Sequence, residues 1–525
     1  MIVRNQEVMP HIWPTVVHML ADAVARSPDG IALVCEEESL TYRQYAACVS
    51  GLARQLATLG VGKESRVALV MSNSLDITIA TFAVQAAGAQ VVPLNPAYTV
   101  AELVPMIESA QPSTIFYDSA VSNALAPILA RFQSEHCIEV GPGAKRFTCW
   151  RDDLSLAAQL PLPDPETLST LQYTGGTTGR SKGVELTHRS IATNVSQREA
   201  LFPTEPERER VLVITPLFHV YAMAMGLYLA CYGRATLVII PKFRPDVVLE
   251  AIERHSITLM SGSPTIFISL MAYEGFQNYD LSSLRACSSG ASALSSETLN
   301  RWELATGCVV SEGYGQSETG PVLTYNPRYG TRKLSSVGIA VPLTEVQIVD
   351  TETGKNILSV GAVGEIRVRG PQLMQGYRGL PAETELSLHD GWLYTSDIGE
   401  LDADGYLYIR DRKKEMVIVG GFNVYPREIE DALATHPDVI EAGVVGVADA
   451  YLGEALVACV VTRSSSTTKE VLIEHLASRL VKYKIPREVR FVNMIPKTSI
   501  GKTDKNQLRL DVAANTPFGD NNHVS

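Results

Sequence analysis

Apolar residues follow two different spacings along the first half of the chain. Residues 13–28 carry apolar side chains three and four positions apart, which predicts an amphipathic helix. Short, continuous apolar runs at 31–35 and 66–71 predict buried strands, and 76–89 and 90–96 predict a helix and the next strand. Because strands and helices alternate, we expect parallel sheets with helices on both faces.

The same alternation recurs between residues 211 and 274. The longest apolar stretch of this part, 216–233, has a proline and a histidine near its start and ends in Gly233 and Arg234. A membrane helix needs about twenty apolar residues, so a buried helix beneath a ligand pocket is the better interpretation.

The alternation of predicted strands and helices ends after residue 335. Short strands are predicted at 346–350, 364–370 and 405–411, separated by turns, which indicates a smaller antiparallel or barrel-like layer. Beyond it, the pattern becomes that of a compact α+β domain, with predicted helices and strands at 426–437, 439–447, 455–463 and 469–483. We therefore predict the α/β class, with a large N-terminal domain (1–411) and a small C-terminal domain (412–525).

Composition narrows the classes of function. The net charge is −12 and no basic stripe is visible, so we expect no nucleic-acid partner. The eight cysteines form no C-x-x-C pair, which argues against a zinc ribbon and predicts buried free thiols in a reducing compartment. The N-terminus lacks an apolar signal core, so we expect a cytoplasmic protein without a membrane span.

The densest cluster of glycine and hydroxyl residues is "YTGGTTGRSKG" at 173–183, with four glycines and three threonines. It lies between a predicted strand (167–173) and a predicted helix (189–199). Inward-turned backbone N–H groups, hydroxyls and Lys182 would suit a phosphate better than a plain surface loop would. It is not a Walker A loop, because a serine precedes Lys182 and a glycine follows it, and no Rossmann glycine spacing occurs.

Residues 173–188, "YTGGTTGRSKGVELTH", resemble the phosphate-binding signature of the AMP-forming acyl-CoA synthetase superfamily, the adenylate-forming enzymes. "EGYGQSETGP" (312–321) resembles its adenine and metal motif. Residues 391–430 resemble its ribose-binding, hinge and tunnel motifs, and 495–509 its catalytic-lysine motif. Together these cover the chain from about 30 to 510.

Three departures from the family pattern occur. The opening is T-G-G rather than T-S-G, a variant associated with fatty acyl-CoA synthetases. The usual T-G-D is Thr395-Ser396-Asp397, which makes the ribose assignment less direct, and the basic pair after the catalytic lysine is thinned to "TDKNQ". None of these changes removes a group that the chemistry needs.

The resemblance implies a two-step reaction of ATP, a carboxylic acid and coenzyme A. The carboxylate attacks the α-phosphorus of ATP to give an acyl-adenylate and pyrophosphate, and a thiol then displaces AMP. Attack on phosphate needs charge neutralisation more than covalent help from the protein. The residues that would bind ATP are Thr174, Gly175, Gly176, Thr177, Thr178, Gly179, Lys182, Gly290, Ala291, Ser292, Tyr314, Gly315, Gln316, Ser317, Asp397 and Arg412.

Within that set the resemblance assigns individual roles. The threonines, the loop glycines and Lys182 would hold the β- and γ-phosphates, and Ser317 the α-phosphate. Tyr314 would stack on adenine, and Asp397 with Arg412 would hold the ribose. Glu318 would bind Mg²⁺, a hard cation that prefers oxygen ligands, where the alternative is a solvated surface carboxylate.

Lys502 is the main catalytic candidate, since it matches the family lysine that bridges the carboxylate and the α-phosphate. A solvated lysine is the alternative. Rotation of a mobile C-terminal domain about a hinge at Lys414 would then replace Lys502 with the loop that carries Gly420, Gly421 and Phe422, which would line the tunnel for coenzyme A. The resemblance also implies acetylation control at Lys502, which would remove its charge.

The acid pocket is predicted from His219, Tyr221, Gly290, Gly315, Pro321 and Val322. His219 would act as a gate and catalytic residue, where the alternative is a satisfied core histidine. No arginine or lysine occurs in these segments, so we expect a monocarboxylate, and the sequence leaves fatty and aromatic acids open.

We therefore predict an AMP-forming acid–CoA ligase that acts on a hydrophobic monocarboxylate. Its partners would be the acid, ATP and coenzyme A, with Mg²⁺, and a homodimer is allowed. The alternatives are an acyl-AMP ligase that loads a carrier-protein thiol and a catalytically silent nucleotide or acyl-CoA binding protein. A luciferase-like oxygenase has no support in the residues.

Overall fold

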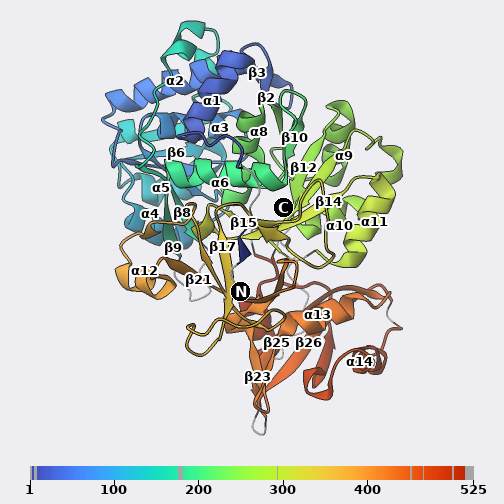
Figure 1. Cartoon of the computed structure of the whole chain (residues 1–525). Coiled ribbons are helices and arrows are strands. Elements are labelled where there is room, and N and C mark those ends of the chain that lie inside the picture. Colours follow the sequence, from blue (N-terminus) through green and yellow to red (C-terminus); the bar gives the residue numbers. More distant parts are fainter. Residues whose placement is uncertain are drawn as a thin grey trace.

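The computed structural model describes residues 3–4, 9–174, 181–292, 294–449, 452–464, 466–498 and 502–514. Two mostly parallel sheets and a smaller antiparallel sheet form an N-terminal body, and a fourth sheet with its helices lies below this body in Figure 1, drawn in orange and red. The predicted α/β class is therefore confirmed.

The first parallel sheet has seven strands in the order β19-β9-β8-β5-β4-β6-β7. Its five strands from β8 to β7 are parallel, and β9 and β19 are antiparallel additions at one edge. The strands are β4 (Arg66–Val70), β5 (Gln90–Leu94), β6 (Thr114–Asp118), β7 (Cys137–Val140), β8 (Leu168–Thr174), β9 (Lys182–Thr187) and β19 (Gly376–Tyr377). The helices of this part of the chain are α2 (Tyr42–Thr58), α3 (Leu75–Ala86), α4 (Val100–Ala110), α5 (Ser122–Leu129) and α6 (His188–Leu201).

The second sheet has nine strands in the order β16-β15-β14-β13-β12-β10-β11-β2-β3, parallel from β14 to β2. The strands are β2 (Ile31–Cys35), β3 (Glu38–Thr41), β10 (Arg210–Val213), β11 (Thr236–Ile239), β12 (Leu259–Gly262), β13 (Ala286–Ser289), β14 (Val310–Gly315), β15 (Val322–Tyr325) and β16 (Ile339–Ala340). The helices here are α1 (Val16–Arg26), α7 (Val220–Ala222), the π-helical η5 (Met223–Tyr228), α8 (Leu229–Gly233), α9 (Pro245–Arg254), α10 (Pro264–Ala272) and α11 (Ser296–Thr306).

Four helices beside these sheets, α2, α3, α4 and α6, begin where a hydroxyl side chain satisfies a free backbone N–H group. Thr41 accepts from the N–H of the third residue of α2, and Ser74, Thr99 and Thr187 do the same for α3, α4 and α6. All 12 residues of α3 are buried, which is why its sequence is apolar or uncharged on nearly every side. The largest core cluster spans both parallel sheets and fixes them against each other.

The third sheet is antiparallel and corresponds to the predicted smaller layer. Its strands are β1 (Val3–Arg4), β17 (Glu345–Val349), β18 (Gly364–Arg369), β20 (Leu388–His389), β21 (Trp392–Leu401) and β22 (Leu407–Arg412), and α12 (Pro381–Ser387) lies beside it. Short 3₁₀ segments are Ser119–Val121, Ser134–His136, Phe147–Trp150, Leu154–Gln159, Phe276–Asn278, Ser317–Thr319, Lys413–Glu415 and Lys482–Lys484.

The C-terminal part forms its own core around a five-stranded sheet. Its elements are β23 (Val417–Val419), β24 (Phe422–Val424), α13 (Pro426–Ala434), β25 (Val439–Asp449), β26 (Gly453–Thr462), α14 (Lys469–Ala477), β27 (Glu488–Phe491) and α15 (Lys505–Ala513). The exact boundary between residues 411 and 412 stays a prediction.

Two predicted elements differ from the structure. The glycine-rich segment does not lead directly into a helix, because β9 follows it and pairs antiparallel with β8 before α6 begins. The predicted helix 469–483 ends at Ala477, and the chain then turns so that Leu480 and Ile485 pack against the C-terminal core.

The apolar stretch 216–233 is a buried helical segment, as predicted, although it includes the π-helical turn η5. Among the described residues, no helix is both long and apolar enough to span a membrane. All eight cysteines are free thiols; most are buried or half-buried, but Cys149 is exposed, contrary to the expectation that all are buried.

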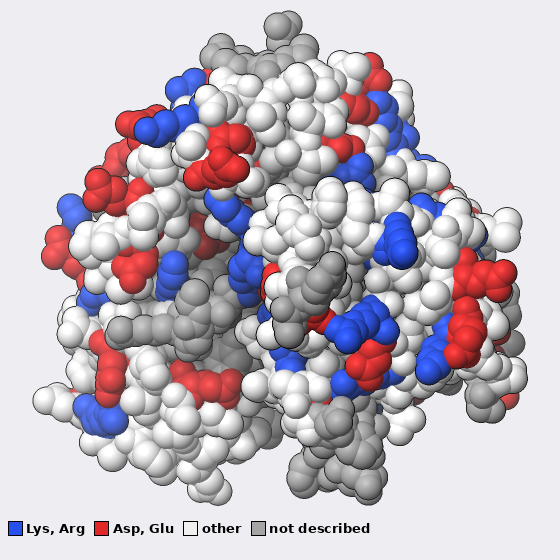
Figure 2. Space-filling view, turned by 90° about the horizontal axis from the view of Figure 1, so that it is seen from below, with Lys and Arg blue, Asp and Glu red and all other residues white. Residues whose placement is uncertain are grey.

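Charged side chains of both signs are interspersed over the face of the molecule shown in Figure 2. Basic groups form no broad stripe among the residues drawn in colour on that face. The expectation that the chain has no nucleic-acid partner rests on the sequence and stays a prediction.

Candidate active site

The Asp397 carboxylate lies where β21 meets the end of β14. Strand pairing places Asp397 directly opposite Arg412, whose Nε lies 3.5 Å from Oδ1. The Tyr314 hydroxyl and the Gln316 side-chain amide both donate to Oδ2, at 2.6 and 2.7 Å. Only 5% of Asp397 is exposed, so these three groups fix the direction of a nearly buried negative charge.

The chain reverses tightly between β14 and β15. A Cβ atom at Gly315 would lie 1.7 Å from the carbonyl oxygen of Pro321, so only glycine fits there. The Gly320–Pro321 peptide bond is cis, and Val322 begins β15. This reversal places Ser317 and Glu318, in the short 3₁₀ turn, beside Tyr314 and Gln316.

Lys502 comes from the C-terminal domain yet lies within the electrostatic field of this cluster. Desolvation and the Arg412 charge lower the pKa of Lys502 to about 8, while the Asp397 charge acts in the opposite direction. Burial, reinforced by the Lys502 charge, lowers the pKa of His219 to about 4. Lys502 therefore interacts electrostatically with His219, Asp397 and Arg412, and the lowered pKa of His219 keeps its ring neutral at pH 7.

The predicted acid pocket is built around Tyr221. Its hydroxyl lies 3.0 Å from the Ser288 hydroxyl, and burial raises the pKa of Tyr221 to about 12. A Cβ atom at Gly290 would lie 2.8 Å from the Tyr221 ring, so this glycine lets the ring pack against the backbone. His219 Nδ1 accepts the Tyr221 backbone N–H at 3.2 Å, which leaves Nε2–H of the neutral ring as the free donor.

The predicted phosphate-binding residues are described only in part. Thr174 ends β8 and its hydroxyl donates to the Lys182 carbonyl at 3.4 Å. The Lys182 ammonium lies 4.8 Å from the centre of the Tyr377 ring. The remaining predicted residues of this loop lie outside the described part of the chain: Gly175, Gly176, Thr177, Thr178 and Gly179.

Gly290, Ala291 and Ser292 directly follow β13, at the carboxyl edge of the parallel sheet. The Gly290 N–H donates to the Gly262 carbonyl at 3.2 Å, and Ala291 has a φ of 69°. Ligands of open α/β sheets bind beyond the carboxyl ends of the strands, so this location suits a nucleotide.

The predicted hinge and tunnel residues form a separate group in the C-terminal domain. Lys414 follows β22 and pairs with Glu415 at 3.2 Å. Gly420 and Gly421 form the turn between β23 and β24, with φ values of 57° and 86°. Phe422 is 55% exposed and stacks on Tyr483 with ring centres 4.5 Å apart. The site around Asp397 does not include these tunnel residues in this arrangement.

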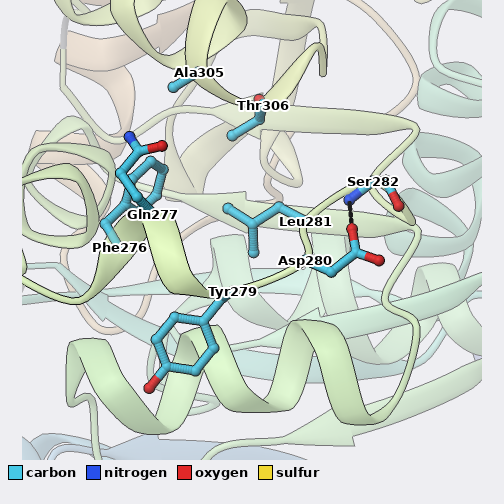
Figure 3. Close-up of a pocket in the computed structure, with 8 residues that line it drawn as sticks. All are labelled: Phe276, Gln277, Tyr279, Asp280, Leu281, Ser282, Ala305 and Thr306. Carbon is cyan, nitrogen blue, oxygen red and sulfur yellow. Dashed lines mark hydrogen bonds between the residues drawn. The ribbon is translucent and has the colours of Figure 1, made fainter.

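Two surface cavities lie away from Asp397, and the larger of them borders Tyr377. The smaller, of about 230 Å³, lies between the segment 276–282 and the end of α11, and the Asp280 carboxylate accepts the Ser282 N–H there at 2.9 Å (Figure 3). None of the predicted site residues lines it. The larger, of about 630 Å³, is lined by Glu185 and by residues between Gln375 and Asp390, which include Tyr377.

Sequence reasoning missed two polar residues of the site. Ser288 contacts the hydroxyls of both Tyr221 and Tyr325. Tyr377 donates its hydroxyl to Glu318 Oε1 at 2.8 Å. Ser288 begins the sequence "SSGAS" (288–292), which also contains the predicted residues Gly290, Ala291 and Ser292, and could have been found from it. Nothing in the spacing around Tyr377 indicates its partner 59 residues away.

Comparison with known proteins identifies, over almost the whole chain, the same family that the sequence motifs resemble. Residues 20–378 match the AMP-binding enzyme family, and residues 428–502 match the C-terminal domain of AMP-binding enzymes. The chain is 36% identical to a long-chain-fatty-acid–CoA ligase of Bacillus subtilis, over 95% of this chain and 96% of that protein. It is 34% identical to a ligase of the same name from Escherichia coli O157:H7, over 96% and 95%.

Solved structures agree with this result. ATP-bound MatB from Rhodopseudomonas palustris superposes with a TM-score of 0.86 at 30% identity, covering 94% of this chain and 98% of that one. An anthranilate CoA ligase in complex with anthranoyl-AMP superposes with a TM-score of 0.87 at 25% identity, covering 97% and 99%.

The chain belongs to the AMP-binding enzyme family. It is an AMP-forming acid–CoA ligase, and its substrates include ATP and coenzyme A. The predicted family and reaction class are therefore confirmed, while the roles of individual residues stay predictions.

The lowered pKa of Lys502 generates a prediction on pH dependence. Its ammonium form is present below about pH 8 and is lost as pH rises through that value. We expect kcat/KM for ATP in the pyrophosphate-release assay to fall through a midpoint near pH 8, since this parameter reports groups of the free enzyme. In Lys502→Arg, whose guanidinium stays charged, this alkaline decline should be absent. The same decline in both proteins would assign it to another group.

The packing of Tyr221 against Gly290 generates a prediction on acid selectivity. Replacing Tyr221 with Ala opens space beside Gly290 and should shift relative kcat/KM towards bulkier acids, by roughly 1–3 kcal/mol per methylene accommodated. The KM for ATP should change less. Tyr221→Phe keeps the ring and serves as the matched control, so its acid profile should stay close to that of the unmodified enzyme. An unchanged profile in Tyr221→Ala would place the pocket elsewhere.

Proposed function

We propose that this ligase activates a long-chain fatty acid. The proposal rests on one observation: the residues predicted to line the acid pocket carry no charge. Tyr221 packs on Gly290 there, and His219 is neutral at pH 7. A pocket wall without a cation favours an acid that has a single carboxylate at its reacting end and is apolar elsewhere. The near full-length relatives named as long-chain-fatty-acid–CoA ligases support the fatty rather than the aromatic acid.

In the first step, Lys502 is the mobile positive charge. Its ammonium bridges the attacking carboxylate and the α-phosphate and offsets the charge that develops between them. A pKa near 8 leaves it mostly protonated at pH 7, and the negative charge of bound ATP favours that form further. The neutral His219 offers an N–H donor at the entrance of the acid pocket without a competing charge.

Asp397 accepts the ribose hydroxyls, and Arg412 holds the sugar from the neighbouring strand. The Tyr314 hydroxyl and the Gln316 amide already occupy one oxygen of Asp397, so the carboxylate is oriented before the nucleotide arrives. Tyr314 presents its ring to adenine from this fixed position.

Glu318 is the proposed ligand of Mg²⁺. The described residues contain no cluster of three or more histidine, cysteine or carboxylate side chains that could hold a metal by themselves. A single carboxylate that forms no ion pair within the described chain suits Mg²⁺, which is commonly bound through one or two carboxylates and substrate phosphates. When bound, the ion supplies positive charge to the departing pyrophosphate.

The second step uses the other domain arrangement. Rotation about Lys414 brings Gly420, Gly421 and Phe422 to the site, where they line the path of the pantetheine arm. Left-handed φ values at both glycines support a turn that a side chain would strain as well as block. The homodimer, the cytoplasmic location and the acetylation of Lys502 stay predictions from the sequence.

The proposed acid is tested by measuring pyrophosphate release and acyl-CoA formation with fatty acids of short to long chain and with aryl acids. We expect the highest kcat/KM for long-chain fatty acids and formation of their CoA thioesters. A preference for an aryl acid would overturn the fatty-acid proposal. Pyrophosphate release without any CoA thioester would instead favour the carrier-protein alternative.

A further inference from the structure

Tyr377 connects two oppositely charged side chains of the site. Its hydroxyl donates to Glu318 Oε1 at 2.8 Å, and the Lys182 ammonium lies 4.8 Å from the centre of its ring. Tyr377 is 8% exposed, so both contacts are made by a nearly buried side chain. One residue therefore contacts both the proposed metal ligand and the lysine proposed to bind phosphate.

The backbone around Tyr377 is anchored to both partners. The Met374 N–H donates to the Glu318 carbonyl at 2.9 Å. On the other side, β19 pairs antiparallel with β9, and the Arg378 N–H donates to the Gly183 carbonyl at 2.8 Å. The Tyr377 N–H donates to the Thr384 hydroxyl at 2.8 Å. Segment 374–378 thus bridges the strand that carries Lys182 and the turn that carries Glu318.

The two contacts leave both charges unneutralised. Within the described part of the chain, the Glu318 carboxylate and the Lys182 ammonium both contact Tyr377, and neither forms an ion pair with another side chain. A neutral hydroxyl orients the Glu318 carboxylate without cancelling its charge. The face of an aromatic ring attracts the Lys182 ammonium, again without cancelling its charge. Had the two side chains paired directly, each would have lost much of its attraction for a ligand.

We propose that Tyr377 is a positioning residue that separates Lys182 from Glu318 and orients both for the Mg²⁺ complex of ATP. This inference rests on the proposed function, because it takes Glu318 as the metal ligand and Lys182 as a phosphate ligand. Glu318 then meets the cation and Lys182 meets the polyphosphate, with the tyrosine ring between them.

The test measures ATP binding by calorimetry while the Mg²⁺ concentration is varied, which needs no turnover. Tyr377→Phe removes the hydroxyl and keeps the ring. We expect it to raise the Mg²⁺ concentration required for half-maximal ATP affinity about 10-fold, in line with loss of a hydrogen bond to a charged group. Tyr377→Leu removes both contacts and should also weaken ATP binding when Mg²⁺ is saturating.

Tyr408→Phe is the matched control. The Tyr408 hydroxyl also donates to a carboxylate, that of Asp402 at 3.3 Å, but away from the site, and its loss should leave the Mg²⁺ dependence unchanged. Thermal unfolding of each variant identifies any that fails to fold, and Tyr377→Phe still tests the contact with Glu318 if Tyr377→Leu does not fold.

Glu318→Gln separates failure of this inference from failure of the proposed function. If Glu318→Gln changes the Mg²⁺ dependence and Tyr377→Phe does not, Tyr377 is only a packing residue and the inference is wrong. If neither variant changes the Mg²⁺ dependence, Glu318 is not the metal ligand. The proposed role of Glu318 and the inference about Tyr377 then fail together.

Discussion

The structure of the site depends on one nearly buried carboxylate, that of Asp397. Three parts of the N-terminal body meet there: the end of β14 through Tyr314 and Gln316, β21 itself, and the end of β22 through Arg412. Burying a carboxylate is costly unless hydrogen bonds and an opposite charge compensate it. The same contacts that make the burial tolerable also fix the direction of the carboxylate and the ends of the strands around it.

The position of Lys502 depends on a second set of charges in the C-terminal domain. Helix α15 follows Lys502, and its residues Lys505 and Arg509 pair with Glu430 and Glu415. Glu415 lies next to the predicted hinge residue, so the segment that carries Lys502 is attached to the point about which the domain would turn. In the arrangement observed, the charges of Asp397 and Arg412 act on Lys502.

A further contact crosses the predicted domain boundary. Asp411 accepts the backbone N–H of Arg427, at the start of α13, at 3.0 Å. These residues lie on opposite sides of Lys414, so a rotation about the hinge would separate them. Much of this organisation could be predicted from the sequence, since alternating apolar runs indicated the parallel sheets and local motifs indicated Asp397, Arg412 and Lys502. Strand β9 and the Tyr377–Glu318 contact could not, because an added antiparallel strand and a long-range hydrogen bond leave no local pattern.

The central claim is that Lys502 serves the adenylating step alone. The most direct measurement is the rate of each half-reaction in Lys502→Ala: pyrophosphate release with ATP and acid, and thioester formation from supplied acyl-AMP and coenzyme A. The account predicts a loss of ~10²-fold or more in the first and a nearly unchanged second, as expected when a preorganised charge is removed from one step. Equal losses in both half-reactions would contradict it and would make Lys502 a structural residue.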